Sequence, residues 1–261
     1  MTSPEDRWRD PLCDTATRVQ ALLEQMSLPE KIAQLGSYWP QAAPAGISSD
    51  HREVAPMEHA FQVGQRTPEE AMAHGLGHVT RVFGTAPLDP VAGGERVLSL
   101  QETATSSRLG IPAILHEECL TGFTTLGATT YPAPIAWGAT FDPDLVRRMA
   151  AAIGSDMAAV GVHQGLAPVL DVVRDYRWGR VEECIGEDPY LVATLGTAYV
   201  EGIQSAGVIA TLRRDSRKLP AKRCPCLTWE CPRNSERAGV WGVGCRWRLG
   251  LRSRRGTPRR M

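Results

Sequence analysis

The sequence lacks the features that would place it in a membrane, secreted or disulfide-stabilised class. No segment approaches the roughly 18 consecutive apolar residues of a membrane-spanning helix, so no membrane partner is expected. The N-terminal segment reads MTSPEDRWRDP, with charges and prolines where a signal peptide needs an apolar run, which predicts a cytoplasmic protein. The seven cysteines are odd in number and unevenly spaced, unlike a disulfide framework. An apolar fraction of 43% over 261 residues indicates a globular protein with a sizeable core.

The sequence also lacks a net charge, but this balance hides two oppositely charged parts. Residues 213–261 contain 13 arginines and 2 lysines against 3 acidic residues, which gives a charge of +12. Because the whole chain sums to zero, residues 1–212 carry a charge of −12. A basic segment attached to an acidic body is typical of proteins with a nucleic-acid-binding arm, so nucleic-acid binding is one alternative function.

Residues 1–212 show helix starts that alternate with short apolar runs. Helix starts are indicated where Ser, Thr or Asp precedes a first turn with proline, at residues 27, 67, 142 and 188. Strands are predicted at residues 79–83, 111–115, 166–170 and 208–212, and residues 40–66 are predicted to form a long loop. In the helix after residue 142, the apolar face is predicted to comprise Leu145, Met149, Ile153 and Met157. Strands alternating with helices predict an α/β fold with a parallel sheet, open or closed into a barrel.

Polar side chains follow two of these strands. Such residues lie at the carboxyl ends of parallel strands, where ligands bind in α/β folds. Carboxylates and guanidinium groups there could hold the hydroxyls of a polyol, whereas the alternative is that they are solvated loop residues or helix caps. The two groups are His116, Glu117 and Glu118, and Asp171, Arg174 and Asp175.

Four ordered motifs between residues 15 and 212 resemble glycoside hydrolase family 3. Residues 175–190 read DYRWGRVEECIGEDPY and are similar to the RDPRWGRxxE…GEDP signature of that family. Residues 110–120 (GIPAILHEECL), 130–142 (TYPAPIAWGATFD) and 26–35 (MSLPEKIAQL) are similar to its other motifs. The bacterial β-glucosidases and β-xylosidases of the family are the members that the chain resembles.

The resemblance implies the first part of a (β/α)8 TIM-type barrel and hydrolysis of β-glucosides or β-xylosides with retention of configuration, without a cofactor or metal. It places Glu118 where the family has a carboxylate that binds sugar hydroxyls, and Arg180 where the family has its sugar-binding arginine. Trp178 is a candidate for stacking on a sugar, although structural packing is favoured for a large aromatic residue. Glu187 is interpreted as a loop anchor and Asp188 as a helix cap, rather than as catalysts.

The sequence departs from the family pattern at several positions. Tyr176 replaces a proline, and Thr121 stands where many members have a histidine. After the strand that ends at Leu212, the family continues with a sugar-binding Lys-His pair, and here Arg213 and Arg214 occupy those positions. Nothing after Leu212 resembles the segment that carries the family's nucleophilic aspartate.

Residues 213–261 therefore form a separate segment, which has three possible interpretations. A nucleic-acid arm would explain the arginines, but three tryptophans lack a recognisable module. A zinc site would use four cysteines, but their spacing is unusual and the segment has no histidine. The favoured interpretation is a lost reading frame, since the segment is rich in Arg, Pro, Cys and Trp without a period, which predicts an out-of-frame, disordered tail.

The sequence thus predicts a family 3 barrel portion over residues 1–212 that holds part of the sugar site, Glu118 and Arg180, without a catalytic nucleophile. A small carbohydrate is the expected partner, rather than nucleic acid. A glycoside hydrolase domain without its nucleophile should be inactive, and an incomplete barrel should aggregate at its open sheet edges. The alternative function is that of a non-catalytic carbohydrate-binding protein.

Overall fold

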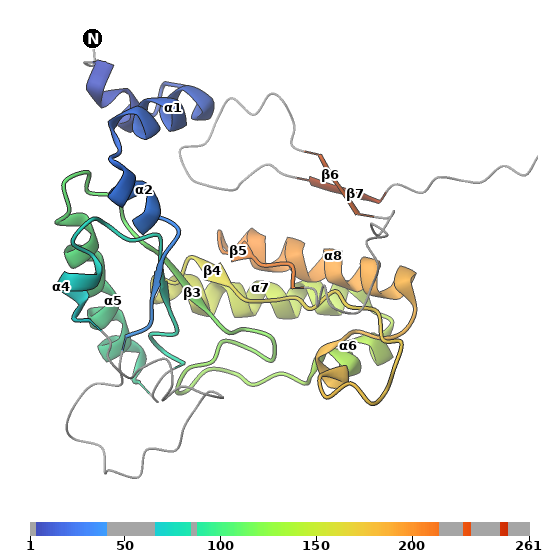
Figure 1. The fold of residues 1–261 in the computed structure, drawn as a ribbon. Coiled ribbons are helices and arrows are strands. Elements are labelled where there is room, and N and C mark those ends of the chain that lie inside the picture. Colours follow the sequence, from blue (N-terminus) through green and yellow to red (C-terminus); the bar gives the residue numbers. More distant parts are fainter. Residues whose placement is uncertain (1–3, 41–65, 85–87, 214–226, 231–245, 250–261) are drawn as a thin grey trace, which may run out of the picture.

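The computed structural model describes residues 4–40, 66–84, 88–213, 227–230 and 246–249, and its centre is a five-stranded parallel sheet (Figure 1). The strands are β1 (Ser37–Tyr38), β2 (His78–Thr80), β3 (Ile114–Glu117), β4 (Gln164–Gly165) and β5 (Ile209–Ala210). Each strand pairs in parallel with the next along the chain. This order, with helices between successive strands, is that of the first strands of a TIM-type (β/α)8 barrel and confirms the predicted fold class.

Most of the helices connect successive strands, and the first three precede the first strand. They are η1 (Pro4–Arg9), α1 (Thr15–Gln25), α2 (Leu28–Ala33), α4 (Pro68–Ala71), α5 (Pro90–Thr105), α6 (Pro134–Thr140), α7 (Pro143–Ala159), η2 (Val181–Glu183) and α8 (Pro189–Ser205). Helix α5 links β2 to β3, α6 and α7 link β3 to β4, and α8 links β4 to β5. None of the described helices has the length and apolar character needed to cross a bilayer.

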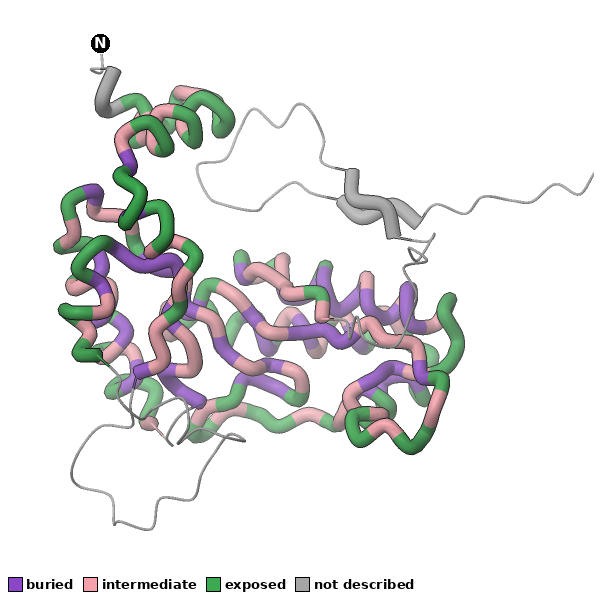
Figure 2. The backbone as a smooth tube through the Cα atoms, viewed as in Figure 1, coloured by how far each residue is buried: buried purple, intermediate pink, exposed green. Residues whose placement is uncertain are grey.

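The core lies between the sheet and helices α5, α7 and α8 (Figure 2). Burial alternates along β2 and β3, so that Val79 and Leu115 face the helices while His78 and His116 face the opposite side, which is the interior of a closed barrel. Helices α7 and α8 cross closely at Gly202, where a Cβ atom would lie 2.3 Å from the carbonyl oxygen of Arg147. This close crossing requires glycine at position 202.

The predicted helix starts are confirmed. Ser27 and Glu30 form a reciprocal capping box at the start of α2, and the side chain of Thr67 caps α4 in the same way. The carboxylates of Asp142 and Asp188 accept hydrogen bonds from backbone N–H groups three residues later, at the starts of α7 and α8. Asp188 is therefore the helix cap that the sequence predicts.

An ion pair between buried Glu30 and exposed Arg108 connects the N-terminal helices to the barrel portion. Glu30 accepts hydrogen bonds from Nε and Nη2 of Arg108 at 2.8 and 2.7 Å, and Arg108 follows α5. Arg108 also donates to the carbonyl oxygen of Gln25 at the end of α1. The hydrogen bonds from Arg108 lower the pKa of Glu30 to about 2, so this carboxylate is charged across the physiological range.

Two sequence-based predictions of local detail were wrong. The strands are displaced from their predicted ranges, since β3 begins at Ile114 rather than at residue 111, and β4 ends at Gly165, before residues 166–170. On α7 the buried residues are Val146, Ala150, Ile153, Gly154 and Met157. Leu145, which was predicted to face the core, is 41% exposed, so the apolar face is rotated from the predicted one.

Of residues 213–261, the structure describes Arg213 and two short strands, β6 (Leu227–Glu230) and β7 (Arg246–Leu249), which pair antiparallel. The rest of this segment lies outside the described residues, as does most of the loop predicted over residues 40–66. The out-of-frame interpretation of the tail, and its predicted disorder, stay predictions.

Candidate functional site

Polar and aromatic residues follow the strands at the carboxyl edge of the sheet. The residues directly after β1 to β4 are Trp39, Arg81, Glu118 and Leu166. Because adjacent parallel strands end at the same edge, these four residues of widely separated sequence become neighbours. This edge is where ligand sites lie in parallel α/β folds.

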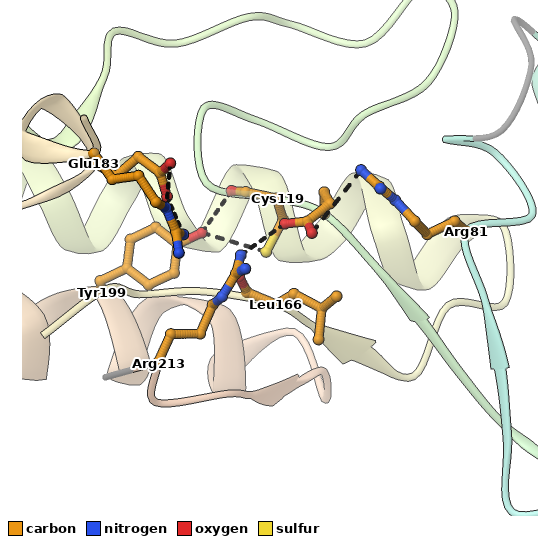
Figure 3. A network of polar contacts seen from close by, with 8 residues as sticks. Arg81, Cys119, Leu166, Glu183, Tyr199 and Arg213 are labelled. Atoms are coloured by element: carbon orange, nitrogen blue, oxygen red, sulfur yellow. Dashed lines mark hydrogen bonds and ion pairs between the residues drawn. The ribbon is translucent and has the colours of Figure 1, made fainter. Parts of the chain in front are cut away.

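Glu118 is held by arginine side chains from two directions (Figure 3). Nη1 of Arg213 donates to Oε2 of Glu118 at 3.0 Å and to the carbonyl oxygen of Leu166 at 3.2 Å. On the other side, Nη2 of Arg81 lies 3.9 Å from Oε1 of Glu118. The Glu118 side chain keeps 23% of its surface exposed, so its oriented carboxylate can still accept hydrogen bonds from a ligand.

Arg180 forms an ion pair with Glu183, and the charges around Glu118 act on this pair. Its Nε donates to Oε1 of Glu183 at 2.8 Å, and its Nη2 donates to Oε2 of the same side chain. These hydrogen bonds raise the pKa of Arg180 and lower the pKa of Glu183. The negative charge of Glu118 also raises the pKa of Arg180, and the positive charge of Arg213 also lowers the pKa of Glu183. The structure therefore brings the two predicted site residues, Glu118 and Arg180, into one cluster, with Glu183 orienting the arginine.

The backbone beneath Glu118 is fixed by buried contacts. The hydroxyl of Tyr199, from α8, donates to the carbonyl oxygen of Cys119 at 2.8 Å, and its ring stacks on Trp137 of α6 at a centroid distance of 5.0 Å. A Cβ atom at Gly165 would lie 2.5 Å from Sγ of Cys119, so β4 passes directly against this residue. Burial raises the pKa of the Cys119 thiol to about 12, which keeps it protonated and rules it out as a nucleophile.

The two glutamates of the His-Glu-Glu motif have different environments. His116 and Glu117 lie within β3, and Glu118 alone is past its end, which corrects the prediction that all three follow the strand. Glu117 is 1% exposed on the helix side of the sheet, where its Oε1 accepts a hydrogen bond from the backbone N–H of Phe83 at 2.8 Å. Burial raises the pKa of Glu117 to about 8.

His116 lies on the side of β3 opposite to Glu117. Its ring centroid is 5.5 Å from that of His78 on β2. Burial, together with the nearby charges of His78 and Arg81, lowers the pKa of His116 to about 4. The imidazole is therefore neutral near pH 7, and it adds no positive charge to the site.

Asp175, from the second group of predicted polar residues, lies in the loop after β4. Asp175 pairs with Arg177, whose side chain is 91% exposed, so this pair is part of a solvated loop. Tyr176, which replaces the proline of the family pattern, donates a hydrogen bond from its hydroxyl to Oε2 of Glu187. This contact supports the interpretation of Glu187 as a loop anchor. Trp178 packs on the small buried cluster of Val169, Val173 and Cys184, in agreement with its structural interpretation.

The part of the chain that the structure describes does not support the metal alternative. The described residues hold no group of three or more His, Cys, Asp or Glu side chains that could bind a metal ion. The tail cysteines of the zinc alternative lie outside the described residues. A cavity of about 190 Å³ lies between α6 and α7, with Tyr131, Trp137 and Met149 in its wall.

The sequence did not predict Arg81 and Trp39 as members of the cluster, and it left the role of Glu183 open. Arg81 was assigned to the middle of a strand predicted over residues 79–83, and because β2 ends at Thr80, it is in fact the first residue of the following loop. The sequence offered no signal for this, because Val82 and Phe83 continue the predicted strand beyond the arginine.

Comparison with known proteins gives a consistent result. The model of the glycosyl hydrolase family 3 N terminal domain matches residues 27–214. A putative β-xylosidase from Formosa agariphila is 31% identical over 195 residues, which cover 72% of this chain and 23% of that protein. A periplasmic β-glucosidase/β-xylosidase from Dickeya chrysanthemi is 28% identical over 78% of this chain and 30% of its own length. The chain thus spans less than a third of the length of these relatives.

Solved structures show the same similarity. A β-glucosidase from Erythrobacter marinus superposes with a TM-score of 0.64 at 31% identity, covering 80% of this chain and 26% of that one. A mutant β-glucosidase from Listeria innocua in complex with laminaribiose has a TM-score of 0.58 at 31% identity, covering 75% of this chain and 26% of that one. Because the family match covers most of the sequence, and the observed sheet order and strand-edge cluster agree with it, this chain belongs to glycosyl hydrolase family 3, within the N-terminal domain of that family.

Proposed function

We propose that the chain binds the sugar of β-linked glucosides or xylosides at the strand edge around Glu118, with Arg180 as a second binding residue. The observation that carries this proposal is the arrangement of Glu118, whose carboxylate is oriented by Arg213 while part of its surface stays exposed. Adjacent sugar hydroxyls can donate hydrogen bonds to a carboxylate and accept them from a guanidinium group. The names of the relatives support glucosides and xylosides as the ligand class.

We propose further that this chain binds sugar without cleaving it. Retaining hydrolysis uses two carboxyl groups roughly 5–5.5 Å apart, one of which attacks the anomeric carbon. Glu117 is buried on the helix side of β3, and Glu183 is engaged by Arg180, so neither is presented beside Glu118 as a nucleophile. The sequence places no nucleophile motif after Leu212. The cytoplasmic localisation stays a prediction from the N-terminal segment.

The test combines turnover and binding on the full chain. We expect no release of p-nitrophenol from p-nitrophenyl β-D-glucoside or β-D-xyloside, together with a saturation-transfer NMR signal from methyl β-D-glucoside or methyl β-D-xyloside. The signal should be weaker in Glu118→Gln, which loses the negative charge, and unchanged in Glu102→Gln, an exposed residue on α5. Hydrolysis by the chain would contradict binding without turnover, and a signal unaffected by Glu118→Gln would contradict the assigned site.

A further inference from the structure

We propose that Trp39 and Arg81 form a second wall of the sugar site, with Glu117 as the residue that positions Arg81; this inference rests on the proposed function. The wall is a row of three side chains at the ends of the adjacent strands β1, β2 and β3. The guanidinium carbon of Arg81 lies 5.5 Å from the centre of the Trp39 ring, and Arg81 reaches 3.9 Å from Glu118 on its other side. An aromatic ring, a guanidinium group and a carboxylate are thus contiguous.

The chemistry of this row matches a pyranoside. The face of an indole ring packs on the apolar C–H face of a sugar, while the guanidinium group donates hydrogen bonds to neighbouring hydroxyls. Since Arg81 and Glu118 are 3.9 Å apart, one monosaccharide can contact both side chains. The row therefore fits a sugar with an apolar C–H face and adjacent hydroxyls, which β-glucosides and β-xylosides share.

The backbone of Arg81 supports a role for its side chain. Arg81 has a φ of 56°, in the left-handed region that glycine occupies at lower cost, and its N–H donates to the carbonyl oxygen of His116 at 3.0 Å. Strained non-glycine residues of this kind cluster at ligand sites, where the surrounding structure holds them in place. From this turn, Nη2 of Arg81 reaches a position 3.9 Å from Oε1 of Glu118.

Glu117 supplies that surrounding structure from the opposite side of β3. Its carboxyl group accepts a hydrogen bond from the N–H of Phe83, two residues after Arg81, and its Oε2 would lie 3.2 Å from a Cβ atom at Gly84. Phe83 is in turn wedged against Gly93 of α5, where a Cβ atom would lie 2.0 Å from its ring, and it meets Phe123 edge to face at 5.3 Å. The loop over residues 81–84 is therefore fixed at its base by Glu117 and Phe83.

The first experiment measures dissociation constants of the full chain for methyl β-D-glucoside and methyl β-D-xyloside by isothermal titration calorimetry. We expect Arg81→Gln to weaken binding about tenfold, because a polar group of the site loses its charged partner, and Trp39→Phe to weaken it severalfold. Matched controls are Arg148→Gln, at an exposed position on α7, and Trp8→Phe, on the N-terminal helix η1. Both controls should bind as the wild type does.

The outcomes separate this inference from the proposed function. If the wild type binds and Glu118→Gln weakens binding while Arg81→Gln and Trp39→Phe do not, the second wall is wrong and the proposed function stands. If the wild type binds neither glycoside, the proposed function fails and this inference fails with it.

The positioning role of Glu117 has its own test, a double-mutant cycle. Glu117→Leu removes the acceptor for the Phe83 N–H and should weaken binding as much as Arg81→Gln, whereas Glu117→Gln keeps a carbonyl acceptor and should restore most of the affinity. The double variant Glu117→Leu/Arg81→Gln should bind no more weakly than Arg81→Gln alone, since both changes remove the same contact. Additive losses, or equal losses in Glu117→Leu and Glu117→Gln, would show that Glu117 acts on the fold in general. If Glu117→Leu does not fold, the comparison of Glu117→Gln with Arg81→Gln decides, because only the latter should lose affinity.

Discussion

Glu117 should make the stability of the fold decrease as the pH rises from about 5 to 8. Burial raises the pKa of this carboxyl from 4.5 to about 8. Between these two values the folded chain binds a proton that the unfolded chain has lost, so the slope of stability with pH is negative in this window. The stability that protonated Glu117 contributes is fully present below pH 4.5 and is lost as the pH rises through 8.

The magnitude follows from the size of the shift. Each unit of pKa difference corresponds to about 1.4 kcal/mol, so the shift sets an upper bound of about 5 kcal/mol on the change. The N–H groups of Phe83 and Gly84 and the charge of Arg81 stabilise the ionised form, whereas Glu118 destabilises it. These contributions are already contained in the pKa of about 8. Because the range from pH 5 to pH 8 covers only part of the interval over which the group titrates, we expect a change of roughly 2 to 4 kcal/mol.

The assay is urea unfolding of the wild type and Glu117→Gln at several pH values between 5 and 8, followed by circular dichroism. Glutamine keeps a carbonyl acceptor for the Phe83 N–H but does not titrate, so the stability of the variant should lose most of this pH dependence. Other groups are common to both proteins, so their contributions cancel in the difference. Glu102→Gln, exposed on α5, should keep the wild-type slope. Parallel slopes for the wild type and Glu117→Gln would refute the reasoning.

Two further predictions concern contacts that hold the helices in place. Glu30→Gln should destabilise the chain by about 1 to 3 kcal/mol at pH 7, since it weakens the ion pair with Arg108. Because the pKa of Glu30 in the folded chain is about 2, this contribution is present above pH 4.5 and is lost as the pH falls toward 2. The difference in unfolding free energy between the wild type and Glu30→Gln, measured by urea unfolding, should therefore shrink at low pH. A difference that stays constant with pH would contradict the assignment. Gly202→Ala should lower stability by about 1 to 3 kcal/mol in thermal unfolding, because its Cβ atom would meet the backbone of Arg147. Gly94→Ala is the control, because nothing lies within 4 Å of a Cβ atom at this position on α5, and it should be neutral or stabilising. Equal effects of Gly202→Ala and Gly94→Ala would show that the α7–α8 crossing is not tight.

The features that the sequence predicted well depend on local contacts. The caps at Ser27, Asp142 and Asp188 use hydrogen bonds to residues three positions away, so the spacing of residue types is sufficient to find them. The alternation of strands and helices was also predictable, although the first strand, β1, was not predicted because its two residues carry no apolar run. Glu118 and Arg180 were found through sequence motifs rather than through any local physical signal.

The features that the sequence did not predict depend on tertiary structure. The strands are only two to four residues long, so an apolar run of five residues cannot fix their ends, and Arg81 was hidden inside such a run. The apolar face of α7 was misplaced because Leu145 is apolar yet exposed, and its burial depends on how the helix packs on α8. The contrast between Glu117 and Glu118 arises from the end point of β3, which decides which of the two adjacent glutamates is buried.

The central claim is that Glu118 at the strand edge binds a sugar. Its most direct test is calorimetric titration of the full chain and of Glu118→Gln with methyl β-D-glucoside and methyl β-D-xyloside. We predict saturable binding of at least one glycoside by the wild type and a loss of about tenfold or more in affinity for the variant. Equal affinity of the two proteins, or a wild type that binds neither glycoside, would contradict the claim.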